Sequence, residues 1–320
     1  MAKLNKTRQL LIDSYKRALT EGEYIWKKGW RAPEMPKNAM SNRKYNGVNK
    51  ALLYYMSMQK GYKDPRWCTF QQAKKEGWSV KKGEHGVPIE YWYLYDKKNK
   101  CAIDQKTAKE EIAKNPERNK DFFWLSRTFT VFNCQQIDNV PEYEQPQTKW
   151  EEGELSDFAL NVVTALGVDY GEGGGQAYYM PSEDRIQVPE KESFYSEYEF
   201  VSTLLHECSH ASMNQRRLNY NFGSQGFGSP GYAKEELVAE MSSSFLCGEL
   251  GVEMSQDHID NHTAYVQSWV EILEKNPEEL FASISKAEKV AEYIENVGGL
   301  EKFKETKEQE LGQTIEREYE

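Results

Sequence analysis

The sequence predicts an α+β protein of two domains, and three observations support this. Its 320 residues exceed what one hydrophobic core usually organises. Stretches with helical spacing and stretches with strand-like composition both occur. Residues 1–150 contain 29 Lys and Arg against 17 Asp and Glu, a net charge of +12, whereas residues 151–320 contain 12 against 34, a net charge of −22. Seven of the eight tryptophans lie in the first half, so we expect two modules with different partners.

The composition excludes several classes of protein. With 38% hydrophobic and 29% charged residues, the chain is typical of globular proteins rather than disordered ones. No apolar run approaches the roughly 20 residues that cross a bilayer, and the first residues lack the apolar core of a signal peptide. The five cysteines are well separated and form no CxxC pair, which argues against a disulfide scaffold and a thiolate zinc site. We therefore expect a cytoplasmic protein without a membrane partner.

The first domain is expected over residues 1–138. Helical spacing and glycine stops predict helices, and β-branched and aromatic residues predict strands. The expected helices are 4–19, 48–60 (stopping at Gly61) and 69–77, and the expected strands are 87–96 and 126–133. The polar stretch between these two strands is expected to be an exposed insertion or a mobile extension of the hairpin.

A linker with two prolines is expected over residues 139–155, followed by a second domain over 156–300 and a charged tail over 301–320 that frays. The second domain is predicted to begin with a helix from Ser156, as its N-cap, to Gly167. A β-hairpin with its turn at 181–184 follows, and then come helices at 196–218, 233–250 and 260–297.

The strongest chemical signal is the stretch His206-Glu207-Cys208-Ser209-His210. In an α-helix, residues four apart differ by only about 40° in direction, so both imidazoles can bind one ion. Glu207 lies beside them and can reach a metal-bound water, which is how the His-Glu-x-x-His motif works in zinc proteases. The alternative is a surface helix with two histidines and a glutamate. An apolar stripe on the same helix favours a core helix instead; it consists of Val201, Leu204, Leu205, Cys208 and Ala211.

A catalytic zinc site needs one more protein ligand. Glu236 follows His210 by 26 residues, on the next predicted helix, and is the expected third ligand. Glu240, one turn further on, is expected to accept a hydrogen bond from a ligand histidine. Glu235 is a rival ligand because the sequence does not define how the two helices face each other, and all three glutamates could instead solvate an exposed helix face. Zn²⁺ is the expected ion for two His and one Glu, and Mn²⁺ is also compatible.

Such a site predicts metal-assisted hydrolysis. The ion lowers the pKa of its bound water to about 7, and Glu207 takes the proton and returns it to the leaving amine. Residues 176–181 are expected to form an edge strand along which an extended peptide substrate lies. Tyr178, Tyr179 and Tyr232 are candidates for stabilising the oxyanion, with ordinary packing as the alternative. His258 and His262 are also four apart but have no Glu between them, so we assign them no metal role.

Several motifs resemble the ArdC family of antirestriction proteins and the related polyvalent proteins encoded by plasmids and phages. YYMPSEDRIQVP, LLHECSHAS, GYAKEELVAEMSSSFL and AYVQSWVEIL are similar to the family's metallopeptidase domain. RKYNGVNKALL, DPRWCTFQQAKKEGWSVKKGEHGVPIEYW and FTVFNCQQID are similar to its N-terminal domain, which is associated with binding of single-stranded DNA. The resemblance covers residues 20–297 and implies a zincin-like second domain. It also implies that His206, His210 and Glu236 are the metal ligands.

Two departures from the family pattern stand out. Ala211-Ser212-Met213 follows the second histidine where the family usually has Trp-Thr-Gly, which bears on the cleft beside the metal. The usual Pro-Trp pairs near the start are replaced by IWKKGW, which bears on the DNA surface.

The basic first half is itself suited to single-stranded DNA, because proteins hold such strands with cationic grooves and aromatic platforms for the bases. The alternatives are that its tryptophans belong to the core and that its lysines are simply solvated. The candidate DNA-binding residues are Arg43, Tyr45, Arg66, Trp67, Lys74, Lys81, Lys82 and Trp92.

The sequence therefore predicts an antirestriction factor that binds single-stranded DNA and carries a peptidase-type metal site. The alternative is a genuine metalloprotease, whose DNA-binding domain directs it to a host or phage regulator protein as substrate. A third hypothesis is a purely structural metal. Because the general base Glu207 is present, hydrolysis is compatible with the sequence.

Overall fold

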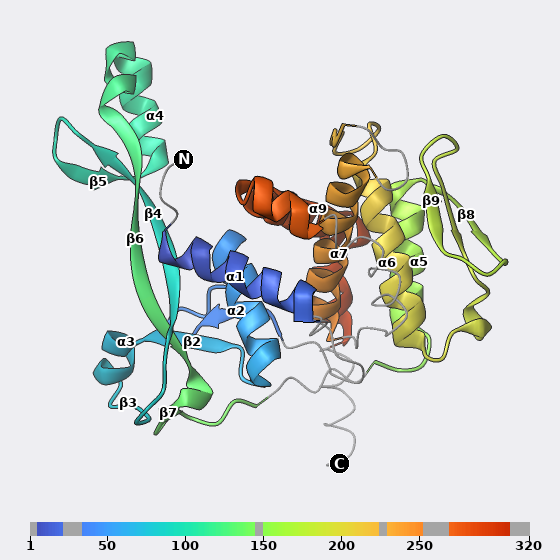
Figure 1. Cartoon of the computed structure of the whole chain (residues 1–320), viewed down its shortest axis with the longest axis horizontal. Coiled ribbons are helices and arrows are strands. Elements are labelled where there is room, and N and C mark those ends of the chain that lie inside the picture. The colour runs from blue at the N-terminus through green and yellow to red at the C-terminus, as the bar shows by residue number, and fades with distance from the viewer. Residues whose placement is uncertain (1–4, 22–33, 145–149, 224–228, 252–268, 308–320) are drawn as a thin grey trace.

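The computed structural model describes residues 5–21, 34–144, 150–223, 229–251 and 269–307. A five-stranded sheet forms one side of the molecule, helices fill the middle, and a three-stranded sheet lies on the opposite side (Figure 1). This arrangement confirms the predicted α+β class. Among the described residues, no helix has the length and apolar character needed to span a membrane.

The large sheet has the strand order β1-β2-β6-β4-β5. Its centre is the antiparallel pair of β4 (Val87–Asp96) and β6 (Phe122–Asn133). The flanking strands are β1 (Lys37–Asn38), β2 (Arg66–Thr69) and β5 (Cys101–Ile103), and a separate small ladder joins β3 (Ser79–Val80) to β7 (Ile137–Asp138). Strand β4 has its predicted bounds, whereas β6 begins four residues before the predicted start at 126.

Three helices accompany this sheet: α1 (Lys6–Glu21), α2 (Gly47–Lys60) and α3 (Phe70–Lys75). Helix α2 ends where predicted, because Gly61 takes the left-handed conformation (φ 69°) and its N–H caps the last turn. Helix α3 begins with a capping box in which the Thr69 side chain and Gln72 satisfy each other's backbone N–H groups.

The insertion between β4 and β6 is a folded extension of the sheet. It consists of β5, α4 (Gln105–Lys114) and a 3₁₀ helix, η1 (Pro116–Asp121), at the top of Figure 1. Buried Arg118 holds it together by pairing with Asp96, Glu111 and Asp121. One fully satisfied guanidinium thus compensates for the small number of apolar residues in this segment.

The second domain contains a bundle of helices, of which α6 (Glu197–Met213) packs against a small sheet of order β8-β10-β9. Its helices are α5 (Glu154–Leu166), α6 (Glu197–Met213), α7 (Pro230–Leu250) and α9 (Glu278–Gly298), with further helical residues at 269–275. Its strands are β8 (Asp169–Glu172), β9 (Tyr178–Met180) and β10 (Arg185–Val188), and a 3₁₀ helix, η3 (Lys191–Ser193), follows them. β9 and β10 form the predicted hairpin.

The prediction that Ser156 is an N-cap is wrong, because α5 begins two residues earlier, inside the expected linker. The carboxylate of Glu197 replaces a capping side chain by accepting hydrogen bonds from the backbone N–H of Gly153 (3.2 Å) and Ser156 (2.9 Å). A carboxylate from a distant helix is favourable there because it faces the positive end of the helix dipole.

The expected fraying of the tail is wrong for its first seven residues, since 300–307 are helical. The Phe303 ring stacks on Trp150 with 4.8 Å between centroids, and the Trp150 indole donates to the Leu250 carbonyl (2.8 Å). Lys307 is buried and contacts Glu154 at 2.6 Å. This cluster ties the segment after residue 150 and the start of the tail to the second domain.

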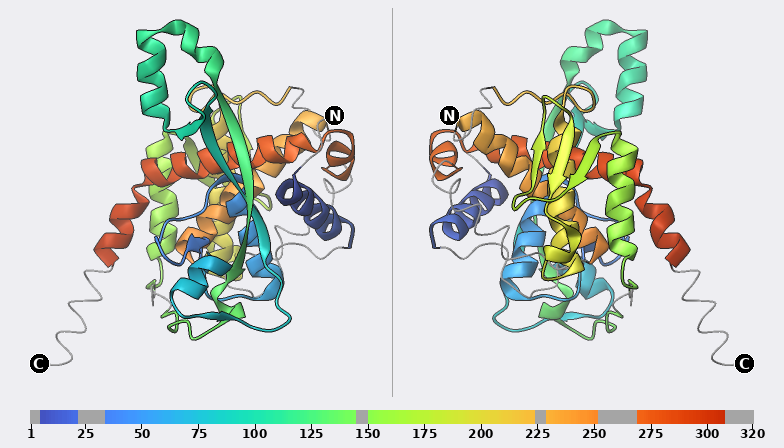
Figure 2. Two further views of the ribbon diagram at one scale, coloured as in Figure 1. Left: turned by 90° about the vertical axis from the view of Figure 1, so that its left-hand side faces the viewer. Right: turned by 90° about the vertical axis from the view of Figure 1, so that its right-hand side faces the viewer.

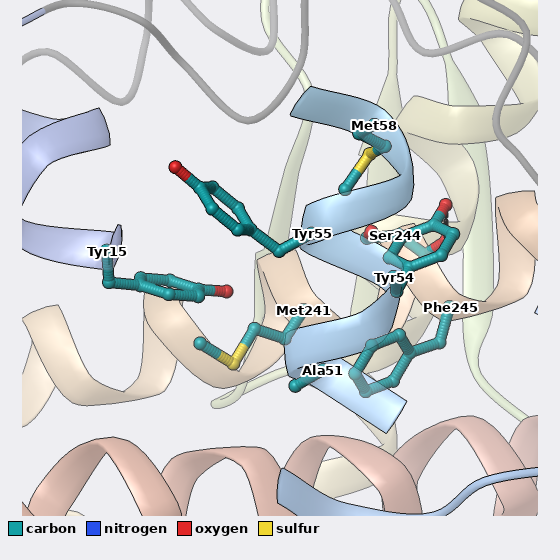
Figure 3. A pocket seen from close by; sticks show the side chains of 8 residues that line it. All are labelled: Tyr15, Ala51, Tyr54, Tyr55, Met58, Met241, Ser244 and Phe245. Carbon is teal, nitrogen blue, oxygen red and sulfur yellow. Dashed lines mark hydrogen bonds between the residues drawn. The ribbon is translucent and has the colours of Figure 1, made fainter. Parts of the chain in front are cut away.

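The two domains share one hydrophobic core in which α2 packs against α7 and α9. Tyr15 from α1, Tyr54 and Tyr55 from α2, and Phe245 from α7 surround a small pocket at this junction (Figure 3). Ion pairs cross the same boundary: Lys44 contacts Glu249 at 2.7 Å, and Arg8 contacts Glu278 at 3.4 Å. Part of the charge contrast between the halves therefore serves the contact between them.

Candidate metal centre

Helix α6 carries the His-Glu-x-x-His motif inside the second domain. Ser196 caps its start by accepting from the Glu199 N–H (3.2 Å). Every residue from 199 to 213 is buried, and the five residues of the predicted apolar stripe have no exposed surface. The alternative of a surface helix is therefore wrong, and the motif lies in the core.

Helix α7 brings Glu236 to the two histidines. One possible ligand atom from each of His206, His210 and Glu236 lies within 4.8 Å of the others. The two Nε2 atoms are 3.2 Å apart, and the carboxylate oxygens of Glu236 lie 3.6 Å from Nε2 of His206 and 3.5 Å from Nε2 of His210. Two imidazole nitrogens and one carboxylate make a donor set that suits Zn²⁺ with a position left for water, and that also suits Mn²⁺.

The other ring nitrogen of each histidine faces a second carboxylate. Nδ1 of His210 lies 3.0 Å from Glu235, and Nδ1 of His206 lies 3.4 Å from Glu240. Such a carboxylate behind a ligand histidine fixes the ring and directs Nε2 forward. Glu235, the rival ligand of the sequence argument, thus lies behind His210 and outside the group of three converging residues.

The charges around these histidines are arranged for a cation. Burial alone lowers the pKa of His206, but hydrogen bonds that its ring donates to the carboxylates of Glu236 and Glu240 outweigh this effect and raise the pKa to about 9. The pKa of His210 is likewise raised well above its ordinary value, against burial, by Glu236 and Glu235. Burial raises the pKa of Glu236, but the two imidazoles lower it well below its ordinary value. The carboxylates thus favour positive charge at the two imidazoles, which a bound divalent ion would supply.

Glu207 lies between the histidines and the small sheet. Burial raises the pKa of its carboxyl group, the two imidazoles oppose this effect, and the backbone N–H of Tyr179 donates to it. Tyr179 belongs to β9, which is one of the two edge strands of its sheet. A carboxyl group with a raised pKa beside the predicted ligands has the properties of a general base.

The three oxyanion candidates have different surroundings. The hydroxyl of Tyr179 donates to Asp184 (2.7 Å) and accepts from the Asn214 amide (2.7 Å), so it is committed to holding the hairpin. For Tyr179 the structure thus favours the alternative of ordinary packing. Tyr178 is exposed and Tyr232 is half-buried. His258 and His262 lie outside the described residues.

A buried ion pair that the sequence argument missed anchors this hairpin to α6. Asp184, in the hairpin turn, contacts Arg217 at 2.9 Å and Arg216 at 3.0 Å. Arg217 also donates to the Leu166 carbonyl (2.9 Å). The signal in the sequence was the Arg pair directly after the motif helix, opposite a turn that ends in Asp.

The candidate DNA-binding residues differ in burial and in their contacts within the protein. Trp67 is wrong as a platform for bases, because it lies in β2 with no exposed surface, against the Tyr62 ring (5.8 Å). Arg66 is held by Asp64 at 2.8 Å and by the Pro141 carbonyl at 2.7 Å.

The remaining candidates vary in exposure. Tyr45 is half-buried and accepts from Asn38, whereas Trp92 is 43% exposed on β4. Four cationic candidates are exposed: Arg43, Lys74, Lys81 and Lys82.

Both halves match known domain families. Residues 5–132 match the N-terminal domain of the antirestriction factor ArdC, and residues 158–286 match a zincin-like metallopeptidase domain. The solved structure of a plasmid-encoded antirestriction protein ArdC superimposes with a TM-score of 0.69 in both its metal-free and its Mn(II)-bound form. The sequence identities are 27% and 28%, and the match covers 92% of this chain and 98% of the other.

Sequence relatives cover most of the chain. A protein of unknown role from Sinorhizobium fredii is 32% identical over 301 residues, covering 91% of this chain and 94% of its own length. Two DNA primases TraC of Escherichia coli are 34% and 33% identical over 288 and 287 residues, covering 89% and 86% of this chain. The chain spans only 26% and 19% of the length of these primases.

Proposed function

Because the chain belongs to the ArdC antirestriction family, we propose that it protects DNA from restriction by binding single strands through its first domain, and that its second domain carries a metal-dependent hydrolytic centre. The boundary between the domains falls in the segment 139–155. The observation that carries the second part is the convergence of His206, His210 and Glu236 beside Glu207.

His206, His210 and Glu236 would hold a divalent ion, with Zn²⁺ as the first candidate and Mn²⁺ as the second. Such an ion supplies a Lewis acid and lowers the pKa of water. Glu207 accepts the proton of the attacking water and delivers it to the leaving amine, which its raised pKa favours. The edge strand β9 offers backbone groups to an extended peptide, so a protein is the expected substrate.

For the first domain, the support is its net positive charge and its exposed cations, which favour the phosphate backbone. A protein acting on DNA and proteins inside the cell fits a cytoplasmic location. The candidate contacts with phosphate are the exposed Arg43, Lys74, Lys81 and Lys82, with Trp92 as a candidate for stacking.

Two measurements on the purified chain test the two halves of the proposal. Fluorescence anisotropy should show tighter binding to a single-stranded oligonucleotide than to a duplex of the same length, weakening steeply with salt. Elemental analysis should find about one divalent ion per chain, lost in His206→Ala and kept in Glu207→Ala. Absence of single-strand binding would contradict the first half, and full metal content in His206→Ala would contradict the second.

A protection assay in cells separates this function from the alternative, a metalloprotease whose cleavage of a regulator is itself protective. That alternative is favoured by the position of Glu207 next to an edge strand. We expect Glu207→Ala to protect DNA as well as the unaltered chain, with the exposed Glu192→Ala as matched control. Loss of protection in Glu207→Ala alone would favour the protease. Unfolding of the second domain on metal removal would favour a structural metal.

A further inference from the structure

The antiparallel ribbon of β4 and β6 is unusually aromatic. The strands pair without interruption from Val87 with Val131 to Asp96 with Phe122. The ribbon runs up the outer side of the molecule, and the left-hand view of Figure 2 looks onto it. Eight aromatic residues lie along this paired length: Tyr91, Trp92, Tyr93, Tyr95, Phe122, Phe123, Trp124 and Phe129.

The pairing register places most of these rings on one face. Residues directly opposite each other in an antiparallel pair point to the same side, and alternate residues of a strand share a side. Tyr91 pairs with Arg127, and Tyr95 pairs with Phe123. We call this side the aromatic face; it comprises Tyr91, Tyr93, Tyr95, Phe123, Phe129 and Arg127.

The aromatic face is accessible to a ligand. Tyr91 is 57% exposed, Phe129 is 43% exposed and Arg127 is also exposed. These large side chains therefore do not fill a core among the described residues. A contiguous exposed patch of rings is typical of a binding surface.

The rings form a continuous surface with a cation on it. Tyr91 and Tyr93 lie nearly parallel, at an angle of 19° with 6.2 Å between centroids, and Phe129 meets Tyr91 edge-on at 6.2 Å. The Arg127 guanidinium lies 5.2 Å from the centroid of the Tyr93 ring. π-surfaces alternating with a guanidinium are the combination that binds bases and phosphates together.

The charges of the ribbon favour a polyanion. Its only carboxylates are Glu90 and Asp96; both are buried, and they pair with Arg8 and Arg118. Ten residues of β4 extend about 33 Å. Exposed lysines lie before and after this length: Lys81, Lys82, Lys97, Lys98 and Lys100.

We propose that the aromatic face of the β4–β6 ribbon is the platform on which the bases of single-stranded DNA stack, with Arg127 and the lysines at its two ends contacting phosphates. This inference rests on the proposed single-strand binding and assigns it a site. Stacking uses the π-face that every base has, so binding is tolerant of sequence, and a duplex is disfavoured because its bases stack on one another. Trp92, the candidate for stacking named under the proposed function, lies on the opposite side of the ribbon, near Arg8 (5.6 Å), so this inference assigns stacking to the aromatic face in its place.

The test is a double-mutant cycle that removes aromatic rings from the protein and bases from the DNA, with the binding affinity measured by fluorescence anisotropy. The probes are a labelled oligothymidylate and an oligonucleotide of the same length with abasic sites in its centre. The variants are Tyr91→Ala, Phe129→Ala and the double variant. The matched control is Trp124→Ala, a ring that is 49% exposed on the opposite side of the same ribbon. Because all three rings are exposed, unfolding temperatures should change little.

We expect each alanine on the aromatic face to weaken binding of oligothymidylate about 10-fold, and Tyr91→Phe to restore it. The abasic oligonucleotide should bind the unaltered chain more weakly and should be insensitive to these substitutions. Trp124→Ala should bind both probes like the unaltered chain.

Three outcomes would overturn the inference, and they separate it from the proposed function. If the unaltered chain fails to bind single strands, both fail. If Arg43→Ala with Lys74→Ala weakens binding while the ring variants bind normally, single-strand binding stands and its site lies elsewhere. If the ring variants change only the sedimentation behaviour of the chain, the aromatic face is an interface between copies.

Discussion

Replacing Glu235 by Gln tests whether a carboxylate behind His210 supports the metal centre. The Glu235 carboxylate lies 3.0 Å from Nδ1 of His210, and both side chains are buried. Gln has nearly the same shape but lacks the negative charge that makes the ring a better ligand. Loss of such a partner typically lowers metal affinity 10- to 100-fold, and since the amide oxygen still accepts a hydrogen bond, we expect about 10-fold.

This loss translates into a measurable change in thermal stability. At a free metal concentration 100 times its Kd, the unaltered chain gains about 2.7 kcal/mol from binding, whereas a variant with a 10-fold higher Kd gains about 1.4 kcal/mol. The difference of about 1.3 kcal/mol corresponds to roughly 2 °C in Tm for a chain of this size. Differential scanning calorimetry with chelator and with added Zn²⁺ or Mn²⁺ measures the rise in Tm on metal binding, for the unaltered chain and for the variant.

The control for Glu235→Gln is Glu249→Gln on the same helix. Glu249 contacts Lys44 at 2.7 Å and Lys304 at 3.0 Å, and it lies nine residues beyond Glu240, about 13 Å along α7. The Glu249→Gln substitution should lower the Tm of the metal-free protein and leave the rise in Tm on metal binding unchanged. An unchanged increment in Glu235→Gln would refute the role assigned to this carboxylate.

Three further substitutions probe the fold. Burial and a neighbouring carboxylate raise the pKa of Glu295 from 4.5 to about 7, so its contribution to stability is complete below pH 4.5 and is lost as the pH rises through 7. Glu295→Gln should therefore match the unaltered chain at pH 4.5 and exceed its stability by about 1–2 kcal/mol at pH 8 in urea titrations; equal stability at pH 8 would contradict this. Gly248→Ala would place a methyl carbon 2.9 Å from the Tyr54 hydroxyl between the domains. It should cost about 1–3 kcal/mol in the same assay, and an unchanged Tm would show that the interface adapts. Asp96→Asn removes a buried partner of Arg118 and should cost about 3 kcal/mol. Hydrogen exchange should then rise in the insertion first, and uniform exchange would argue against a local role.

Local patterns predicted the elements whose boundaries depend on one residue or on one run of side chains. Gly61 stops α2 because only its left-handed conformation completes the cap, and the apolar run of β4 defines that strand fully. The start of α5 could not be predicted in this way. Its first turn is capped by Glu197, 41 residues beyond Ser156, and the capping preference of a serine says nothing about such a partner.

In the candidate site, too, local spacing predicted some features, whereas others depend on packing between distant segments. Spacing within α6 was enough to pair His206 with His210, since both lie on one helix. Spacing could not decide between Glu235 and Glu236, because neighbouring residues of a helix differ by about 100° and the rotation of α7 against α6 is set by packing. Trp67 failed for a related reason: an aromatic residue between charged ones can serve either a core or a surface, and its burial in β2 depends on neighbouring strands.

The charge contrast between the halves serves the contact between the domains and, under the proposed function, also DNA binding. The two contributions must be separated before salt effects on DNA binding are interpreted. Lys44, Lys50 and Arg8 pair with glutamates of α7 and α9, so three of the 29 cations in residues 1–150 help to join the domains. The exposed cations Arg43, Lys74, Lys81 and Lys82 lie outside these pairs and are the candidates for an external partner. Salt nevertheless screens both kinds of contact. A steep loss of DNA binding between low and moderate salt can be assigned to phosphate contacts only if the unfolding temperature stays constant over the same range; if it falls as well, part of the loss belongs to the contact between the domains.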